Sequence, residues 1–162
     1  MKNKNLSFMP QAAMIAAIYV VLTYIFAPFS FGEVQVRISE ALTILPIFTP
    51  AAIPGLFAGC LIGNILGGAI LPDIVFGSIA TLIGAFFTWK LREQKPVVAT
   101  FPPIISNIII VPFVLRYGYG VTLPIPFMML TVGIGEVISC TVLGLIVYGA
   151  LKKYKSTLFR TA

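Results

Sequence analysis

Glu136 is the residue whose chemistry is hardest to reconcile with its surroundings. It separates two uncharged runs, residues 117–135 and 137–151, in a chain that is 59% hydrophobic and 10% charged. An ionised carboxylate inside such a segment costs ~2.5 kcal/mol or more, so it needs a partner or a cavity. Ser139 and Cys140 follow three and four residues later and share its helical face. This spacing predicts a deep polar face with a binding role, and a neutral, purely structural glutamic acid is the alternative.

Other polar residues also stand alone in apolar stretches. Asn107 lies in the middle of the uncharged run 96–115, and Asn64 lies beside glycines that recur every fourth residue, at positions 55, 59, 63 and 67. Such a glycine ridge favours close helix packing. Asn64 could form a hydrogen bond across this helix contact, or its side chain could reach a ligand. Arg37, Glu40 and Asp73 fall at the predicted outer ends of apolar segments. Arg37 and Glu40 are three residues apart, so they could pair with each other.

Several kinds of chemistry are missing from the sequence. It has no histidine, no glycine-rich phosphate loop with Lys and Ser/Thr, and no close carboxylate pair within one expected helix. Cys60 and Cys140 lie in apolar runs and are expected to be small core residues. We therefore expect no enzyme, no cofactor and no metal site, and a complete ATP-driven pump does not fit in this chain.

The elements that must position these residues are membrane-spanning helices. A mean hydropathy of +1.03 leaves too little polar surface for a water-soluble protein of 162 residues. About 20 apolar residues cross a bilayer as a helix, and the uncharged runs are close to that length. The alternation of a β-barrel strand is absent from stretches such as 12–22 and 79–87. The fold class is therefore an all-α integral membrane protein.

Prolines decide how many helices there are. Pro46, Pro50 and Pro54 interrupt the long uncharged run 41–72, and each disfavours helix just before it. Splitting this run predicts six transmembrane segments in a single domain, residues 1–162. The segments are expected at 9–28, 38–49, 51–70, 73–91, 97–116 and 125–150. The second is too short to cross unaided, so we expect it to be tilted, partly extended or shielded by its neighbours.

Basic residues indicate the orientation. Nine of the eleven lie in three clusters, at Lys2 and Lys4, at residues 90–95, and at residues 152–160. Six crossings place all three clusters on one side, which the positive-inside rule identifies as cytoplasmic. Both termini are then cytoplasmic, and the loops 33–37 and 116–122 are external. The segment 30–37 could form an external hairpin or lid. Such clustering does not suit a nucleic-acid groove, so nucleic acid is not expected as a partner.

Small residues on the first segment suggest a contact surface. Ala12, Ala13, Ala16 and Ala17 form two small-xxx-small pairs, which let another helix approach closely. The pairs predict either packing within the protein or a docking face for a separate membrane subunit.

Three blocks of sequence carry a family resemblance. They are Val34–Cys60, which includes Val-Gln-Val-Arg-Ile-Ser-Glu-Ala-Leu, Asp73–Phe87, which begins Asp-Ile-Val-Phe-Gly-Ser, and Gly135–Gly144. Together they resemble the QueT family of substrate-binding subunits (S-components) of energy-coupling factor (ECF) transporters. The resemblance implies a six-helix S-component in the cytoplasmic membrane that captures a queuosine precursor, a 7-deazaguanine base, from outside. It also implies a transmembrane T-component and two cytoplasmic ATPase subunits as partners, with the alanine face of the first helix as the docking surface.

A deazaguanine edge offers adjacent N–H donors, which one carboxylate can accept as a bidentate pair. We therefore expect Glu136 at the floor of the substrate site and Glu40, beside Arg37, in recognition or closure. Asn107, Asn64 and Asp73 are weaker candidates, and Asp73 would suit a cationic aminomethyl substituent. An S-component for another vitamin or base, and a self-sufficient carrier or channel with Glu136 as a proton relay, remain alternatives.

Overall fold

The computed structural model describes residues 4–30 and 36–159, and these residues form helices and no strand. In chain order the elements are α1 (Lys4–Ile25), α2 (Ala27–Ser30), η1 (Ile38–Ile47), α3 (Ala52–Leu66), α4 (Leu71–Lys90), α5 (Pro96–Ala99), α6 (Phe101–Phe113), η2 (Val114–Gly118), α7 (Ile125–Glu136), η3 (Val137–Leu143), α8 (Gly144–Lys152) and α9 (Lys155–Leu158). The element η1 is a 3₁₀-helix, whereas η2 and η3 are π-helical. The expected all-helical class is confirmed.

Four helical stretches among the described residues are long and apolar enough to cross a membrane. They are Phe8–Ile25, Leu71–Lys90, Pro96–Gly118 and Ile125–Lys152. The helices η1 and α3 are apolar but shorter. The protein is therefore a multi-pass membrane protein by length and composition, and the two further crossings expected from the sequence stay predictions.

Prolines lie where one helix ends and the next begins, as the sequence predicted. Pro46 lies in the last turn of η1, Pro50 lies in the following turn, and Pro54 lies in the first turn of α3. The first turn of a helix tolerates proline because its N–H groups have no partner within the helix. The long uncharged run is thus divided into two elements, with bounds within a few residues of those expected.

The short second segment is enclosed by its neighbours. Residues 39–46 of η1 are buried, and α1, α3, α4, α8 and η3 all contact this helix. A 3₁₀-helix rises about 2 Å per residue instead of 1.5 Å, so its 10 residues reach further than an α-helix of equal length. Of the three alternatives expected for this segment, shielding by its neighbours is confirmed for η1.

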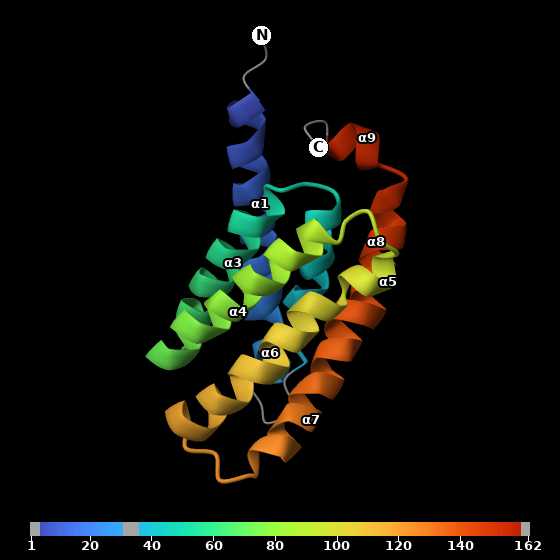
Figure 1. Ribbon diagram of the computed structural model, residues 1–162. Coiled ribbons are helices and arrows are strands. Elements are labelled where there is room, and N and C mark those ends of the chain that lie inside the picture. Colours follow the sequence, from blue (N-terminus) through green and yellow to red (C-terminus); the bar gives the residue numbers. More distant parts are fainter. Residues whose placement is uncertain (1–3, 31–35, 160–162) are drawn as a thin grey trace.

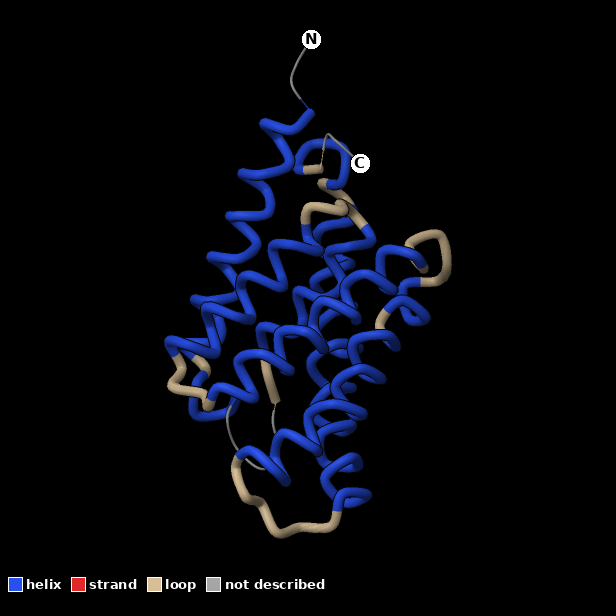
Figure 2. Tube along the Cα trace, turned by 60° about the vertical axis from the view of Figure 1, so that its left-hand side comes forward, coloured by secondary structure: helices blue, strands red, loops and turns tan. Residues whose placement is uncertain are grey.

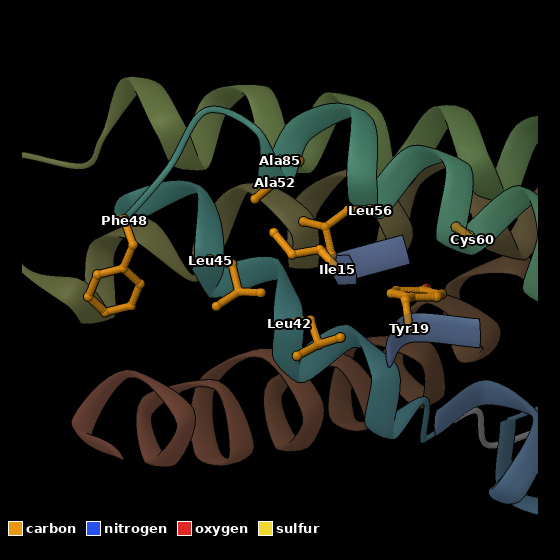
Figure 3. Packing of buried hydrophobic residues seen from close by; sticks show 9 residues of the cluster. All are labelled: Ile15, Tyr19, Leu42, Leu45, Phe48, Ala52, Leu56, Cys60 and Ala85. Atoms are coloured by element: carbon orange, nitrogen blue, oxygen red, sulfur yellow. The ribbon is translucent and has the colours of Figure 1, made fainter. Parts of the chain in front are cut away.

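The apolar core lies where α1, η1 and α3 meet. It contains Ile15 and Tyr19 of α1, Leu42 and Leu45 of η1, and Leu56 of α3, all of them buried. Figure 3 shows these side chains converging between the three elements, with the Tyr19 ring near Cys60. This core fixes the spacing of the helices that carry the polar residues described below.

The basic ends of the helices gather at one end of the bundle. The start of α1, the α4–α5 connection and α9 lie toward the upper end in Figure 1, while the loop between α6 and α7 lies at the opposite end. Figure 2 shows the same arrangement from another side. The upper end carries Lys90 and Lys152, the last residues of α4 and α8. Most of the expected external hairpin or lid lies outside the described residues.

Candidate functional site

A buried group of polar side chains lies inside this apolar bundle and extends to one end of it. We call it the central polar cluster, and it consists of Arg37, Glu40, Asn64, Asp73, Asn107 and Glu136, each no more than 5% exposed. All six are residues that the sequence singled out. Burying charged groups away from water is costly unless they are paired or hydrogen-bonded. Arg37 and Glu40 come from the start of η1 and the others from α3, α4, α6 and α7, and this collection from five elements indicates a site rather than accidental burial.

Arg37 and Asp73 form the outer part of the cluster. The Arg37 Nη2 atom lies 3.4 Å from Asp73 Oδ2, and the Tyr119 hydroxyl donates to the same oxygen over 2.9 Å. These contacts join the start of η1, the first turn of α4 and the loop before α7. Burial and the Asp73 charge raise the pKa of Tyr119 to about 12, so this hydroxyl stays a donor. The suggested Arg37–Glu40 pair is corrected, because Arg37 forms its ion pair with Asp73.

Asp73 keeps one oxygen without a partner among the described residues. Its Oδ1 atom is buried and accepts no hydrogen bond there. A Cβ atom added at Gly77 would lie 2.9 Å from this oxygen and 3.2 Å from Asn64 Nδ2, so a larger residue at position 77 would crowd both. Asn64 also donates to the Asp73 main-chain carbonyl over 3.3 Å. Asn64 therefore both bridges α3 to α4 and borders the free oxygen.

Glu40 is held from two sides by hydroxyl groups. The Tyr19 hydroxyl of α1 donates to Glu40 Oε1, and the Thr81 hydroxyl of α4 lies 3.4 Å from the same oxygen. The other oxygen, Oε2, is buried and has no hydrogen-bond partner among the described residues. A buried carboxylate oxygen without a donor is costly, which is the condition a bound ligand relieves.

Glu136 lies at the junction of α7 and η3. The Cys140 thiol donates to Glu136 Oε2 over 3.2 Å, and Asn107 of α6 lies close to this carboxylate. The predicted shared face of Glu136, Ser139 and Cys140 is confirmed, since all three are buried. The backbone turns π-helical directly after Glu136, a distortion that often accompanies functional sites.

Glu40 and Glu136 are brought close together by the packing of η1 against η3. One carboxylate oxygen of each and the Cys140 sulfur all lie within 4.8 Å of one another. These three atoms could contact one cation, although structural zinc sites use four ligands. The sequence predicted no metal-ligand cluster because these residues are distant along the chain, and the close approach is a finding of the structure.

The alanines of α1 divide between two faces. Ala16 is buried and Ala12 half-buried, and both pack on the glycines of α3: a Cβ at Gly55 would lie 2.7 Å from the Ala12 carbonyl. Ala13 and Ala17 are exposed. The expectation of one docking face is therefore corrected for Ala12 and Ala16, which pack inside the protein. The glycine ridge is confirmed as a packing feature at positions 55, 59 and 63.

Three residues of the site were missed in the sequence. Tyr19, Thr81 and Tyr119 bind the carboxylates of Glu40 and Asp73. Tyr19 follows Ala12 and Ala16 at helical spacing, so its place on the inner face could have been found. Thr81 and Tyr119 carry no comparable signal.

Comparison with known proteins finds a curated relative and a matching family model. A curated relative, the "Queuosine precursor transporter QueT" of Lactococcus lactis subsp. cremoris (strain MG1363), is 34% identical over 73 residues. The match covers 44% of this chain and 43% of the relative, so it spans less than half of that protein. No solved structure matches the chain. The model of the family described as QueT transporter matches residues 9–153, nearly the whole sequence. This multi-pass helical membrane protein therefore belongs to the QueT transporter family.

Proposed function

We propose that the protein is the substrate-capturing subunit of an ECF uptake transporter and binds a queuosine precursor, a base of the 7-deazaguanine type. Family membership supports transport, and the name of the Lactococcus relative supports this substrate. The whole chain acts as a single membrane domain, residues 1–162, in the cytoplasmic membrane. It captures the base from outside and delivers it inward.

The unpartnered acceptors of the central polar cluster carry the proposal. Glu40 Oε2 and Asp73 Oδ1 are buried and receive no donor from the described residues. A deazaguanine presents several N–H donors, which suit carboxylate oxygens in an apolar surrounding. Glu40 and Glu136 accept donors of the ligand, while Asn107, Asn64 and Asp73 border the same space. Arg37 holds Asp73 in place.

The proposed topology has six crossings with both termini in the cytoplasm. The basic ends of α4 and α8 then face the cytoplasm, as the positive-inside rule requires. The opposite end, with Arg37, Asp73 and Tyr119, faces outside and lies between the medium and Glu40. The helix η1 crosses without touching much lipid because its neighbours enclose it.

The energy comes from partner subunits. The sequence lacks a phosphate-binding loop, so ATP hydrolysis belongs to two cytoplasmic ATPases coupled through a T-component. Ala13 and Ala17 present small, exposed side chains on α1, where a partner helix can approach closely. We assign the docking surface to these two residues.

Binding measurements test the substrate assignment. Glu40→Gln and Glu136→Gln should each weaken binding of the queuosine precursor roughly ten- to hundredfold, because a charge-assisted hydrogen bond is lost. Calorimetry on the purified protein measures this. Glu93→Gln is the matched control, since Glu93 is 84% exposed at its side chain in the α4–α5 connection.

Two results would contradict the proposal. One is unchanged affinity in both cluster variants, which would place recognition elsewhere. The other is uptake that persists in cells without the ATPase subunits, which would indicate a self-sufficient carrier. If the protein binds a different vitamin more tightly, it is still a substrate-capturing subunit, but the proposed substrate is wrong.

A further inference from the structure

The charges of the central polar cluster do not balance. It contains three carboxylates, of Glu40, Asp73 and Glu136, and one guanidinium, of Arg37. Arg37 forms its ion pair with Asp73, and neither glutamate forms an ion pair with a described basic residue. The only charged residue within 31–35 is another glutamate, Glu33. Among the described residues, two buried carboxylates therefore lie close together without a basic side chain in an ion pair with either.

The donors that do reach these two glutamates are uncharged. Glu40 accepts from the hydroxyls of Tyr19 and Thr81, and Glu136 accepts from the Cys140 thiol. Neutral donors soften the repulsion between two carboxylates without cancelling their charge. In an apolar surrounding such a pair needs a proton or a cation.

The carboxylates of Glu40 and Glu136 approach closely enough for one nitrogen atom to contact both. A tetrahedral nitrogen that donates to two oxygens over about 2.8 Å each holds them about 4.6 Å apart. The ligand atoms of Glu40 and Glu136 lie within 4.8 Å of each other. A bidentate edge on Glu136 alone, as expected from the sequence, would compete with the Cys140 thiol for Glu136 Oε2. Glu40 Oε2 has no hydrogen-bond partner among the described residues, so Glu40 can accept a further donor without losing one.

We propose that Glu40 and Glu136 together bind one ammonium group of the substrate, so that the transported base is a cation. This inference rests on the proposed function and specifies its substrate class. A deazaguanine that bears a protonated aminomethyl group supplies both the base and the missing positive charge. An uncharged substituent would leave the pair uncompensated and bind more weakly.

The test compares two ligands on the purified full-length protein. One is 7-aminomethyl-7-deazaguanine, and the other carries a hydroxymethyl group, which has a similar size and no charge. The unmodified protein should bind the aminomethyl base roughly ten- to hundredfold more tightly, because charge-assisted bonds are lost with the ammonium. Equal affinity, or tighter binding of the hydroxymethyl base, would overturn the inference while leaving the proposed function intact. Failure of both bases to bind would instead refute the proposed function.

Variants locate the charge recognition. In Glu40→Gln and in Glu136→Gln the ratio of the two affinities should fall toward unity, with most of the loss in the aminomethyl base. Glu93→Gln should keep the ratio of the unmodified protein. A ratio that survives both cluster variants would place the ammonium at another acid. If a variant fails to fold, the ligand comparison on the unmodified protein still decides whether charge is recognised.

Discussion

The two faces of α1 carry the same residue type and have opposite environments. Ala16 is buried against Gly59 of α3, where a Cβ on the glycine would lie 3.1 Å from the Ala16 Cα. Ala17, the next residue, is exposed. One residue along an α-helix turns the side chain by about 100°. A small residue therefore permits internal packing on one face and leaves room for another molecule on the other.

The two faces of α1 also differ in the polarity of their side chains. The inner face continues to Tyr19 and Thr23, which donate to Glu40 and to Ser39 of η1. The outer face carries exposed apolar residues such as Met14 and Val21. Only 17% of the α1 span is buried, against 50% of the span Pro96–Gly118, so α1 has the larger share available to lipid or a partner. One helix, α1, therefore carries both a side chain of the site, Tyr19, and a surface exposed to lipid or a partner.

The largest expected effect lies on the outer face. Ala17→Leu should lower uptake more than about tenfold in cells that contain the partner subunits, because added bulk keeps two backbones apart. Ligand affinity and thermal stability of the purified protein should not change. Met14→Leu is the control, since that position already carries a large exposed side chain. Undiminished uptake by Ala17→Leu would remove this surface from docking.

On the inner face, Gly59→Ala tests internal packing. The new Cβ would lie 2.7 Å from the Tyr19 Cβ, so the helices must separate, at a cost of about 1–3 kcal/mol in unfolding free energy. Denaturation in detergent micelles measures this loss. Gly149→Ala in α8 meets no atom within 4 Å and should be neutral or slightly stabilising. Equal stability of the two variants would show that the seam between α1 and α3 is looser than described.

The smallest expected effect concerns the polar end of the inner face. Thr23→Val keeps the shape of the side chain and removes its 2.9 Å hydrogen bond to the Ser39 hydroxyl, at a cost of about 0.5–1.5 kcal/mol. The same denaturation measurement detects it. Tyr24→Phe alters the neighbouring exposed residue, which is 67% exposed, and should leave stability within about 0.5 kcal/mol. If both substitutions lower the free energy of unfolding by the same amount, the inner and outer faces of α1 do not differ in polar contacts.

The sequence by itself determined the helical class, the division of the chain and the deep position of Glu136. Hydropathy and uncharged length specify membrane helices because each crossing needs a continuous apolar stretch. Pro46, Pro50 and Pro54 specify where η1 ends and α3 begins, because their effect on the backbone is local. Glu136 could be identified as special because an acid between apolar runs is costly wherever the helix packs.

Only the tertiary structure decided which of these residues meet. Glu40 and Glu136 are far apart in sequence, and their approach depends on how η1 packs against η3. Arg37 forms its ion pair with Asp73, although Glu40 is nearer in sequence, because the first turn of α4 lies against the start of η1. The inner and outer alanines of α1 also look alike until α3 covers one pair. Residue type fixes what a side chain can bind, whereas contact between distant segments depends on the packing of all the helices together.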